Sequence, residues 1–540
     1  MVTVALAGLV ALLLSSCSAP ESGGGALGED EGEGATSLVL ADGYESESLN
    51  PVGGHGANGS SRFYDGLVRL DPQGGGEVPA LEPALAREAP EPDEQATTWT
   101  VRLREDVRFH DGSTFGAEDV VATFEAILDA DVASPLATTF DMVERVEAVD
   151  EHEVVFHLAY PYAPFASTLL LGIAPSEQVN AGVPVEEWDL NTQPVGTGPY
   201  RLEDRRGDQM VLAANEDYWD GAPEVDRLTL LPVLDDNTRA QRMTAGEFDG
   251  TTLPPLLANT FEGTEGYQVV SNTSADFRSI TLPTDHPVTG DPAVRTALNL
   301  AVDREAIVSD VLGGHGQPAH TPVPETFGRY HEGEASFAYD VDQAKEVLAE
   351  AGWQPGDDGI RVKDGQRAAF TVMYFPDDTL RRDLASAFAS YALELGIEVS
   401  PEAVARPEFQ PRIPQDPGVF GGGDNPYDPD TQLYSLLHSS YNAEGVGGAF
   451  DNPGDYQNET VDDALEVGRT SLDDDERIEA YRELQRAYVA DPSQVMLVFL
   501  DHVYVMEEDG WDGLEPVLEP HSHGVSWGPW WNLAQWTRGS

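Results

Sequence analysis

The stretch Phe370-Thr-Val-Met-Tyr-Phe375 is a continuous run of apolar and β-branched residues, and Gly396-Ile-Glu-Val399 begins a second short run of this kind. Between them, residues 380–395 carry apolar side chains three and four positions apart, which is the spacing of an amphipathic helix. A strand, a helix and a second strand in this order form a unit whose two strands pair in parallel. This stretch therefore predicts a protein of the α/β class.

Strand and helix patterns alternate on both sides of this unit. Residues 97–103 alternate polar and apolar side chains as a half-buried strand does, whereas residues 118–128 have helical spacing. Asp291-Pro292 has the chemistry of a helix start, residues 294–311 continue the helical pattern, and residues 495–505 are a strong strand candidate. At roughly 150 residues per domain, the 540 residues have room for about three or four domains.

The charge balance is unusual. The chain has 96 acidic and 30 basic residues, and its formal net charge is −66. Binding to nucleic acid phosphates or to an anionic membrane surface requires clustered basic side chains, so both are excluded as general modes of binding. The acidic residues are spread along the chain and indicate a solvated acidic surface. That surface fits a high-salt habitat and general solubility equally well.

The N-terminus has the features of an export signal. Residues 2–14 are almost wholly apolar but too short for a membrane-spanning helix, which needs about twenty residues, and they fit the apolar part of a signal peptide. Cys17, the only cysteine, follows two serines and resembles the acylated cysteine of a bacterial lipobox. Residues 18–35 are rich in Gly, Ser, Glu and Asp and predict a flexible tether. The alternative is a hydrophobic N-terminus with a chance cysteine.

One motif raises the question of an enzyme. Gly524-Val-Ser-Trp-Gly528 matches the G-x-S-x-G turn that carries the nucleophilic serine of α/β hydrolases. In those enzymes the acid and the histidine follow the serine, but residues 529–540 contain no Asp, Glu or His. An exported hydrolase is therefore the weakest alternative, and we expect neither catalytic residues nor a cofactor.

His521 and His523 are the candidate metal ligands. Because they are two positions apart, their imidazoles can lie on the same side of an extended segment. Zinc and nickel sites generally use three or four ligands, and no cysteine lies nearby. A metal role for this pair is an alternative to two surface or cleft histidines.

Two polar segments are candidates for contact with a ligand. Gly53-Gly-His-Gly-Ala-Asn-Gly59 lacks the lysine and the spacing of a phosphate-binding loop, and we interpret it as a ligand-facing loop that presents His55. Asp424-Asn-Pro-Tyr-Asp-Pro-Asp430 lacks the glycine and the distal glutamate of a calcium loop. Its prolines stiffen the turn, so that a carboxylate there is preorganised to hold an ammonium group. A plain surface turn is the alternative.

Several motifs, in order along the chain, resemble those of one family. Residues 98–124 contain Thr98-Trp-Thr-Val-Arg-Leu-Arg-Glu-Asp-Val-Arg-Phe-His-Asp-Gly112 and then Ala117-Glu-Asp-Val-Val-Ala-Thr-Phe124, and Pro194-Val-Gly-Thr-Gly-Pro-Tyr200 follows. Asn215-x-x-Tyr-Trp219 and Val294-Arg-Thr-Ala-Leu-Asn-Leu-Ala-Val-Asp-Arg304 come next. Together they resemble the motifs of the extracellular solute-binding proteins, family 5, over nearly all of 38–510.

The resemblance implies a two-lobed periplasmic-binding-protein-like fold (type II) with a hinge and an additional α/β domain. We expect lobe I to comprise residues 36–70, 195–285 and 500–540, the extra domain II residues 71–194, and lobe III residues 286–499. The family contains the substrate receptors of ABC importers, so the implied partners are permease and ATPase subunits and the implied ligand is a small solute. We expect a monomer held on the extracytoplasmic face of the membrane by its N-terminal lipid.

The resemblance also suggests ligand-binding residues. Dipeptide-binding members carry an aspartate in a G-D-N-x-D-P turn that pairs with the peptide's ammonium group. Residues 423–429 look like that turn with one residue inserted, which makes Asp424 and Asn425 candidates. Nickel-binding members have P-Y-D-P there, and Tyr427 matches their cleft tyrosine. Their metal-contacting histidine has no clear counterpart, because His438 is not equivalently spaced.

A peptide would also need a group to bind its carboxylate. Arginine suits this role because it can bind a carboxylate through two hydrogen bonds, and Arg381 or Arg382 is the candidate, with ordinary helix-surface charges as the alternative. Trp527, in the aromatic C-terminal segment, either stacks on a ligand or packs in the core. The main hypothesis is a receptor for a peptide or peptide-like solute. A nickel-chelate or metallophore receptor and an oligosaccharide receptor are the alternatives.

Overall fold

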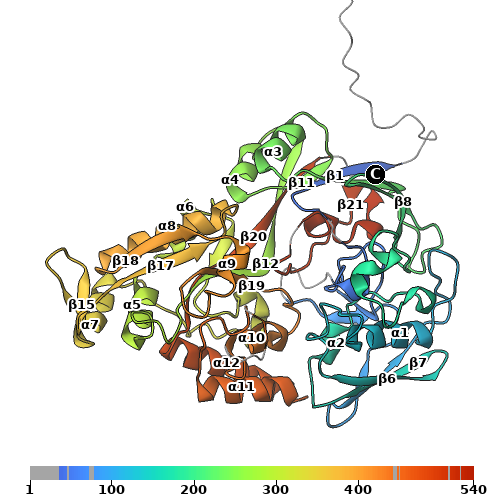
Figure 1. The fold of residues 1–540 in the computed structure, drawn as a ribbon. Coiled ribbons are helices and arrows are strands. Elements are labelled where there is room, and N and C mark those ends of the chain that lie inside the picture. Colours follow the sequence, from blue (N-terminus) through green and yellow to red (C-terminus); the bar gives the residue numbers. More distant parts are fainter. Residues whose placement is uncertain are drawn as a thin grey trace, which may run out of the picture. The chain divides into compact units, whose positions relative to one another are not determined.

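A mixed sheet of nine strands runs through the fold (Figure 1). Its order is β19-β12-β20-β11-β1-β10-β9-β8, and β13 pairs with β20 beside this path. Strands β12 (Tyr267–Thr281) and β20 (Gln494–Glu507) are the longest and pair antiparallel. The others are β1 (Ser37–Asp42), β8 (Tyr200–Arg206), β9 (Gln209–Ala214), β10 (Arg227–Pro232), β11 (Gly250–Thr252), β13 (Gly316–Pro318) and β19 (Val419–Gly422).

The computed structural model describes residues 36–45, 48–71, 78–441, 447–448, 450–508, 511–522 and 524–539. Residues 36–540 form one compact unit, separate from residues 1–35. The predicted lipobox cysteine Cys17, the tether and His523 lie outside the described residues. In the described part of the chain, no helix is long and apolar enough to cross a membrane.

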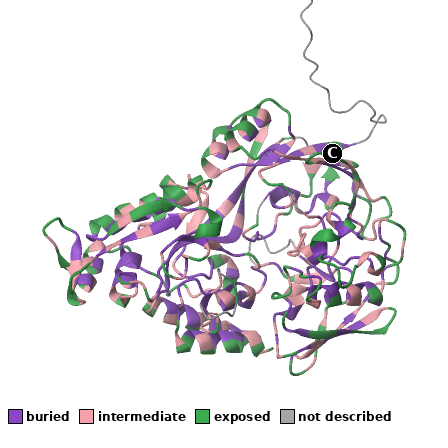
Figure 2. Cartoon of the chain, in the orientation of Figure 1, coloured by how far each residue is buried: buried purple, intermediate pink, exposed green. Residues whose placement is uncertain are grey.

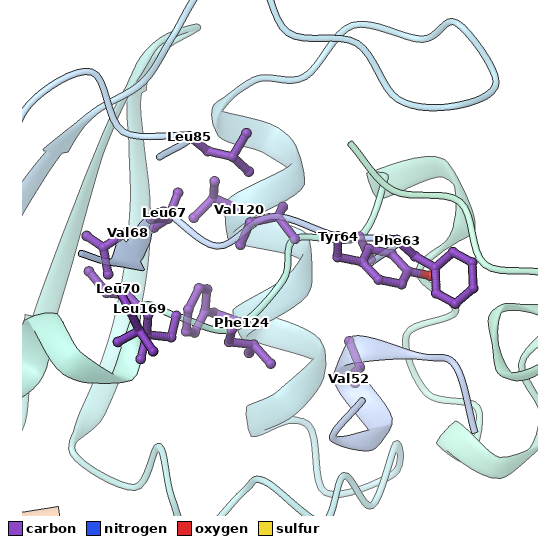
Figure 3. Packing of buried hydrophobic residues seen from close by; sticks show 14 of the residues in the cluster. Val52, Phe63, Tyr64, Leu67, Val68, Leu70, Leu85, Val120, Phe124 and Leu169 are labelled. Carbon is purple, nitrogen blue, oxygen red and sulfur yellow. The ribbon is translucent and has the colours of Figure 1, made fainter. Parts of the chain in front are cut away.

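A second, antiparallel sheet has the order β4-β5-β7-β6. Its strands are β4 (Glu91–Pro92), β5 (Thr98–Arg102), β6 (Val143–Asp150) and β7 (Glu153–Leu158). The predicted helix at 118–128 is confirmed as α1 (Ala117–Leu128), which packs on this sheet. Figure 3 shows how its Val120 and Phe124 meet the buried side chains of Leu67 and Leu169. The hairpin β2 (Val68–Leu70) and β3 (Leu81–Pro83) and the short helix α2 (Phe165–Thr168) lie in the same core.

The strand–helix–strand unit that opened the sequence argument is confirmed. Strand β17 (Ala369–Tyr374) pairs in parallel with β18 (Glu398–Ala403), and α8 (Thr379–Glu394) connects them. The single helical pattern predicted for 294–311 is wrong in one respect, because the chain forms two helices, α5 (Pro292–Ala301) and α6 (Arg304–Asp310). Asp303 ends the pattern because its side chain caps α6, accepting a hydrogen bond from the Ala306 N–H at 3.0 Å.

The remaining elements are short or lie around these sheets. The helices are α3 (Asp236–Thr244), α4 (Pro255–Ala258), α7 (Val341–Glu350), α9 (Arg406–Phe409), α10 (Pro429–Leu437), α11 (Glu459–Thr470) and α12 (Asp474–Ala490). The strands are β14 (Gln354–Pro355), β15 (Arg361–Lys363), β16 (Gln366–Arg367), β21 (Trp511–Asp512) and β22 (Thr537–Arg538).

Figure 2 shows the buried residues in the interior of the fold, and we group the buried apolar clusters into two cores. The first core draws on residues 38–269 and on the C-terminal segment, including Trp527, Trp530 and Trp536. The second core draws mainly on residues 275–500. Strands β12 and β20 contribute to both cores. Residues 504–506 of β20 pair with β11, whereas residues 498–500 of β20 pair with β13 and residues 277–280 of β12 pair with β19. These two strands therefore connect the two cores.

The pairing of β12 and β20 is interrupted at the point where they pass from one core to the other. The register shifts between Thr273 and Phe277, so three β12 residues lie opposite Leu500. Such a bulge bends a strand and exposes backbone groups that need new partners. Here Glu519 supplies them, because its carbonyl accepts from the Ala275 N–H at 2.9 Å and its N–H donates to the Thr273 carbonyl at 3.1 Å.

A buried ionic network fills this bulge. Burial opposes ionisation of Asp276, yet Arg278, His521 and His502 hold its pKa well below its ordinary value. His502 lies between Asp276, at 3.3 Å from Nε2, and Glu519, at 2.6 Å from Nδ1. Burial alone lowers the pKa of His502, but Glu519 and Asp276 outweigh it and raise that pKa to about 9. His502 is therefore a buried imidazolium at neutral pH.

We predict that this histidine makes stability fall as the pH rises. A histidine whose pKa is higher in the folded state stabilises fully below about pH 6.5, and that contribution is lost as the pH passes about 9. Replacing His502→Gln should reduce the free energy of unfolding at pH 6 by about 3 kcal/mol and flatten its pH dependence between those values. Urea unfolding at a series of pH values measures both effects.

His157→Gln is the control, because it removes a more exposed histidine that pairs with Glu147. We expect this variant to keep the wild-type dependence of unfolding on pH. A His502→Gln protein that retains the same slope between pH 6.5 and 9 would contradict the assignment of that slope to the buried network.

Candidate functional site

A cavity of about 1140 Å³ lies between segments that belong to the two cores. From the first core come residues 57–58, 136–142 and 160–170, and from the second come β19 and residues 375–451 together with Arg469. Of the predicted site residues, Asp424, Asn425, Tyr427, Arg381 and His521 line this cavity. Residues distant in sequence thus meet around one partly open cavity, and clefts of this kind are the usual form of a small-molecule site.

The turn after β19 presents Asp424 to solvent at the edge of the cavity. Gly423 has φ of +106°, and a Cβ there would lie 2.2 Å from the carbonyl oxygen of Ala275, so only glycine fits. The Asp424 side chain is exposed, and within the described residues its carboxylate makes no ion pair or hydrogen bond. Its backbone carbonyl accepts a hydrogen bond from Asn58 Nδ2 at 2.8 Å.

The two later acids of the turn are held by arginines. Asp428 caps α10 and accepts from Arg477 Nη2 at 2.6 and 2.8 Å. Asp430 is fully buried and accepts from Arg469 Nε at 3.1 Å and Nη2 at 3.0 Å. Burial raises the pKa of the Asp430 carboxyl above its ordinary value, and Arg469 opposes that rise. Both carboxylates are therefore occupied, whereas Asp424 is available to a ligand.

Tyr427 and Asn425 lie between these acids. The Tyr427 ring lines the cavity and is only 7% exposed. It packs with the first core, although the neighbouring strand β19 contributes to the second. Its hydroxyl donates to the Leu518 carbonyl at 3.4 Å. The Asn425 carbonyl accepts from the Thr431 hydroxyl at 2.5 Å, which closes the turn. Tyr427 thus gives the cavity a rigid aromatic wall.

Two arginines and a histidine converge on Gly421 in β19. A carbon added at Gly421 would lie 2.8 Å from Arg278 Nη1, 2.9 Å from Arg381 Nη2 and 3.1 Å from His521 Cε1. Arg381 pairs with Asp378, and burial together with the nearby Arg278 guanidinium lowers its pKa. Within the described residues the Nε groups of both arginines are buried without a hydrogen-bond partner. Both guanidinium groups lie beside Gly421, so this part of the cavity wall suits an anionic group of a ligand.

The other predicted residues lie elsewhere. His55 packs against the ring of Phe63 at 5.9 Å and does not line the cavity, and burial lowers its pKa to about 4. Ala57 and Asn58 of the same loop do line it. Trp527 is 2% exposed in the first core, and its neighbour Trp530 packs against the ring of Tyr504. Arg382 is exposed and pairs with Asp383.

Sequence reasoning missed several residues that line the cavity. Met142, Tyr160 and Tyr162 line the cavity, and so does Arg469, which lies 39 positions after its partner Asp430. Tyr160 and Tyr162 stand in a Tyr-Pro-Tyr segment that had no recognisable pattern. The two closely spaced tyrosines are the one feature of the sequence that could have indicated these cavity residues. Such a pair occurs in a buried core as well as in a cavity wall.

Comparison with known proteins identifies the family. Residues 80–444 match the family described as bacterial extracellular solute-binding proteins, family 5. The chain belongs to this family. It is therefore a solute-binding protein of an ABC transporter rather than an enzyme, which removes the hydrolase alternative. Proteins of this family lie outside the cytoplasm and pass their solute to permease subunits in the membrane.

Three relatives illustrate the range of named members. Protein XP55 of Streptomyces lividans is 41% identical over 95% of this chain and 92% of its own length. The oligopeptide-binding protein AppA of Bacillus subtilis, solved with a nonapeptide, has 25% identity, a TM-score of 0.75 and coverage of 94% of this chain and 100% of that one. NikZ of Campylobacter jejuni, solved with Ni(L-His), has 27% identity, a TM-score of 0.79 and coverage of 93% and 99%. AppA and NikZ were thus solved with different kinds of solute, a peptide and a nickel–histidine complex.

We predict that the three aspartates of the turn differ sharply in their effect on stability. Asp430→Asn leaves the Arg469 charge without its buried partner and should lower the free energy of unfolding by about 3–5 kcal/mol. Asp424→Asn changes an exposed, unpaired carboxylate and should stay within about 0.5 kcal/mol of wild type. Urea unfolding of both variants tests the contrast. Equal destabilisation by the two changes would show that Asp424 has a structural role.

Proposed function

We propose that the protein captures a peptide or peptide-like solute in this cavity and delivers it to the permease. The observation that carries the proposal is the polarity of one short segment. Gly421, at one end, adjoins Arg278, Arg381 and His521, whereas the unpaired carboxylate of Asp424 stands at the other end. A peptide is a zwitterion, so its carboxylate and ammonium groups complement these two ends.

The spacing along this segment suits a short peptide backbone. Gly421 and Asp424 are three residues apart, which is roughly 10 Å in an extended chain, and that is the scale of a few peptide units. The cavity volume of about 1140 Å³ exceeds the 300–1,000 Å³ of typical pockets for drug-sized ligands. We infer that the extra space takes the side chains of the peptide, and that Tyr427 and Asn425 contact its backbone.

The fold supports a capture mechanism in which two lobes close on the solute. We infer that lobe I (36–70, 195–285 and 500–540) with domain II (71–194) moves against lobe III (286–499). Strands β12 and β20 connect the two cores, and we propose that they bend at the bulge near Asp276, where their pairing changes register. We further propose that Cys17 carries the lipid that holds a monomeric receptor at the membrane, and that an ATPase drives the partner permease.

A nickel–chelate is the second candidate, and His521 supports it. His521 lines the cavity, and its Nδ1 lies 2.7 Å from Asp276 Oδ1. A carboxylate behind an imidazole is the usual arrangement around metal-binding histidines. Within the described residues no group of three or more His, Cys, Asp or Glu side chains could hold an ion. The other ligands would therefore come from the chelator, and an oligosaccharide that stacks on the cavity tyrosines remains the third candidate.

A binding screen of residues 36–540 at high salt tests the proposal. We expect di- to pentapeptides to raise the melting temperature, because a solute that binds only the folded state stabilises it. Asp424→Ala should weaken the binding of an active peptide about 10- to 150-fold, as expected for losing a hydrogen bond to a charged group. Calorimetric titration gives the affinities, and Arg382→Ala, at the exposed neighbour, is the control that keeps wild-type binding.

Modified peptides separate the two ends of the site. N-acetylation should weaken binding to wild type as much as Asp424→Ala does, and should add nothing in that variant. C-terminal amidation should show the same relation to Arg381→Ala. A melting shift caused only by nickel with L-histidine, and lost in His521→Ala, would replace the peptide proposal with the nickel–chelate one.

A further inference from the structure

Arg469 lies where the two sides of the cavity touch. Its guanidinium carbon is 3.1 Å from the ring centroid of Tyr434, which belongs to the same side, and 5.4 Å from that of Tyr162, which belongs to the other. The same guanidinium holds Asp430 through two hydrogen bonds, and Tyr162 also interacts with Asp430. One arginine therefore connects an ion pair of the ligand-binding turn to an aromatic ring of domain II.

Backbone hydrogen bonds reinforce this contact. The Ala163 N–H, next to Tyr162, donates to the Arg469 carbonyl at 2.8 Å. Two more bonds cross at other points, from Asn58 Nδ2 to the Asp424 carbonyl at 2.8 Å and from the Val78 N–H to the Thr326 carbonyl at 3.1 Å. None of these contacts includes a solute. They exist only while the two sides are together.

We propose that Arg469 and Tyr162 form an interlobe latch that determines affinity by stabilising the closed arrangement, whichever solute is bound. This rests on the proposed function only in assuming that lobe closure captures the solute. The apparent affinity for a solute is proportional to the fraction of molecules in the binding-competent state. A contact made only on closure raises that fraction before any solute enters. The latch therefore changes the affinity for all solutes by one common factor, whereas Asp424 and Arg381 choose among them.

Arg477 provides a matched comparison. It holds Asp428 of the same turn through two hydrogen bonds and is also buried. Its other contacts are with Gly468, Tyr330 and Tyr481, which all lie in lobe III. Arg469 and Arg477 thus make similar ion pairs with one turn, but within the described residues only Arg469 reaches domain II. If variants of Arg469 and Arg477 differ in how far the lobes close, the difference is due to the interlobe contact, because both arginines support the turn.

The test measures closure without any solute. The full chain carries Cys17→Ser and two spin labels, at Glu144→Cys on β6 and at Asp475→Cys on α12, which are both exposed. Double electron–electron resonance then gives the distribution of interlobe distances. We expect a short-distance population in the parent protein that falls at least fivefold in Arg469→Gln and in Tyr162→Ala, while Arg477→Gln keeps it. Tyr162→Phe, which keeps the ring and loses the hydroxyl, should give an intermediate value.

Hydrogen exchange at the Ala163 amide is the second measurement, because this group is protected only by the Arg469 carbonyl across the cavity. Exchange should accelerate at least fivefold in Tyr162→Ala and remain unchanged in Arg477→Gln. Three outcomes overturn the latch: a parent protein without a short-distance population, Arg469→Gln and Tyr162→Ala proteins that close like the parent, or equal opening by Arg469→Gln and Arg477→Gln. Since no solute is present, none of these outcomes depends on the peptide proposal.

Discussion

The carboxylate of Asp276 sits in a strand bulge among Arg278, His502 and His521, and the arrangement of the cavity depends on it. Through His502 it reaches Glu519, whose backbone replaces the pairing that the bulge removes. Through His521 and Arg278 it holds two side chains against Gly421 in the cavity wall. A single buried charge thus joins the strands that connect the two cores to the site where a solute binds. Without paired cations, a carboxylate in this position would be too costly to bury.

Several arginines of this acidic chain bind groups inside the molecule. Arg62 binds the carbonyls of Val525 and Trp530, which ties the C-terminal segment to the first core. Arg304 binds the carbonyls of Ala319 and Met496 in the second core. The chain as a whole carries a net charge of −66, and its cavity is lined by both arginines and aspartates. The field outside repels anions, so a solute with a positive group meets the entrance more favourably than a purely anionic one.

The sequence predicted the parts of the fold that rest on local patterns. Periodicity located α1 and the helix of the β17–α8–β18 unit because each helix buries one face, and continuous apolar runs located β17 and β20. It did not find the break at Asp303, since the apolar spacing continues across the two helices. The turn at 423–430 was predictable because proline and glycine restrict it. His55 and Trp527 were weaker candidates, because glycine-rich loops and aromatic tails occur in cores as often as in clefts. Tyr162 and Arg469 were missed because only tertiary structure brings them together.

The three aspartates of the turn show how a rigid support leaves one group available. Asp428 and Asp430 use their charge within the protein, each on a different arginine, and so fix both the start of α10 and the turn before it. Asp424 precedes them by only a few residues. The residue before it must be Gly423, because the backbone of Ala275 leaves no room for a side chain there. The carboxylate of Asp424 is therefore presented from a fixed backbone while remaining solvated. When a solute binds at such a position, the loop loses little conformational freedom. The free energy of the ion pair therefore contributes to affinity and is not offset by the cost of ordering the loop.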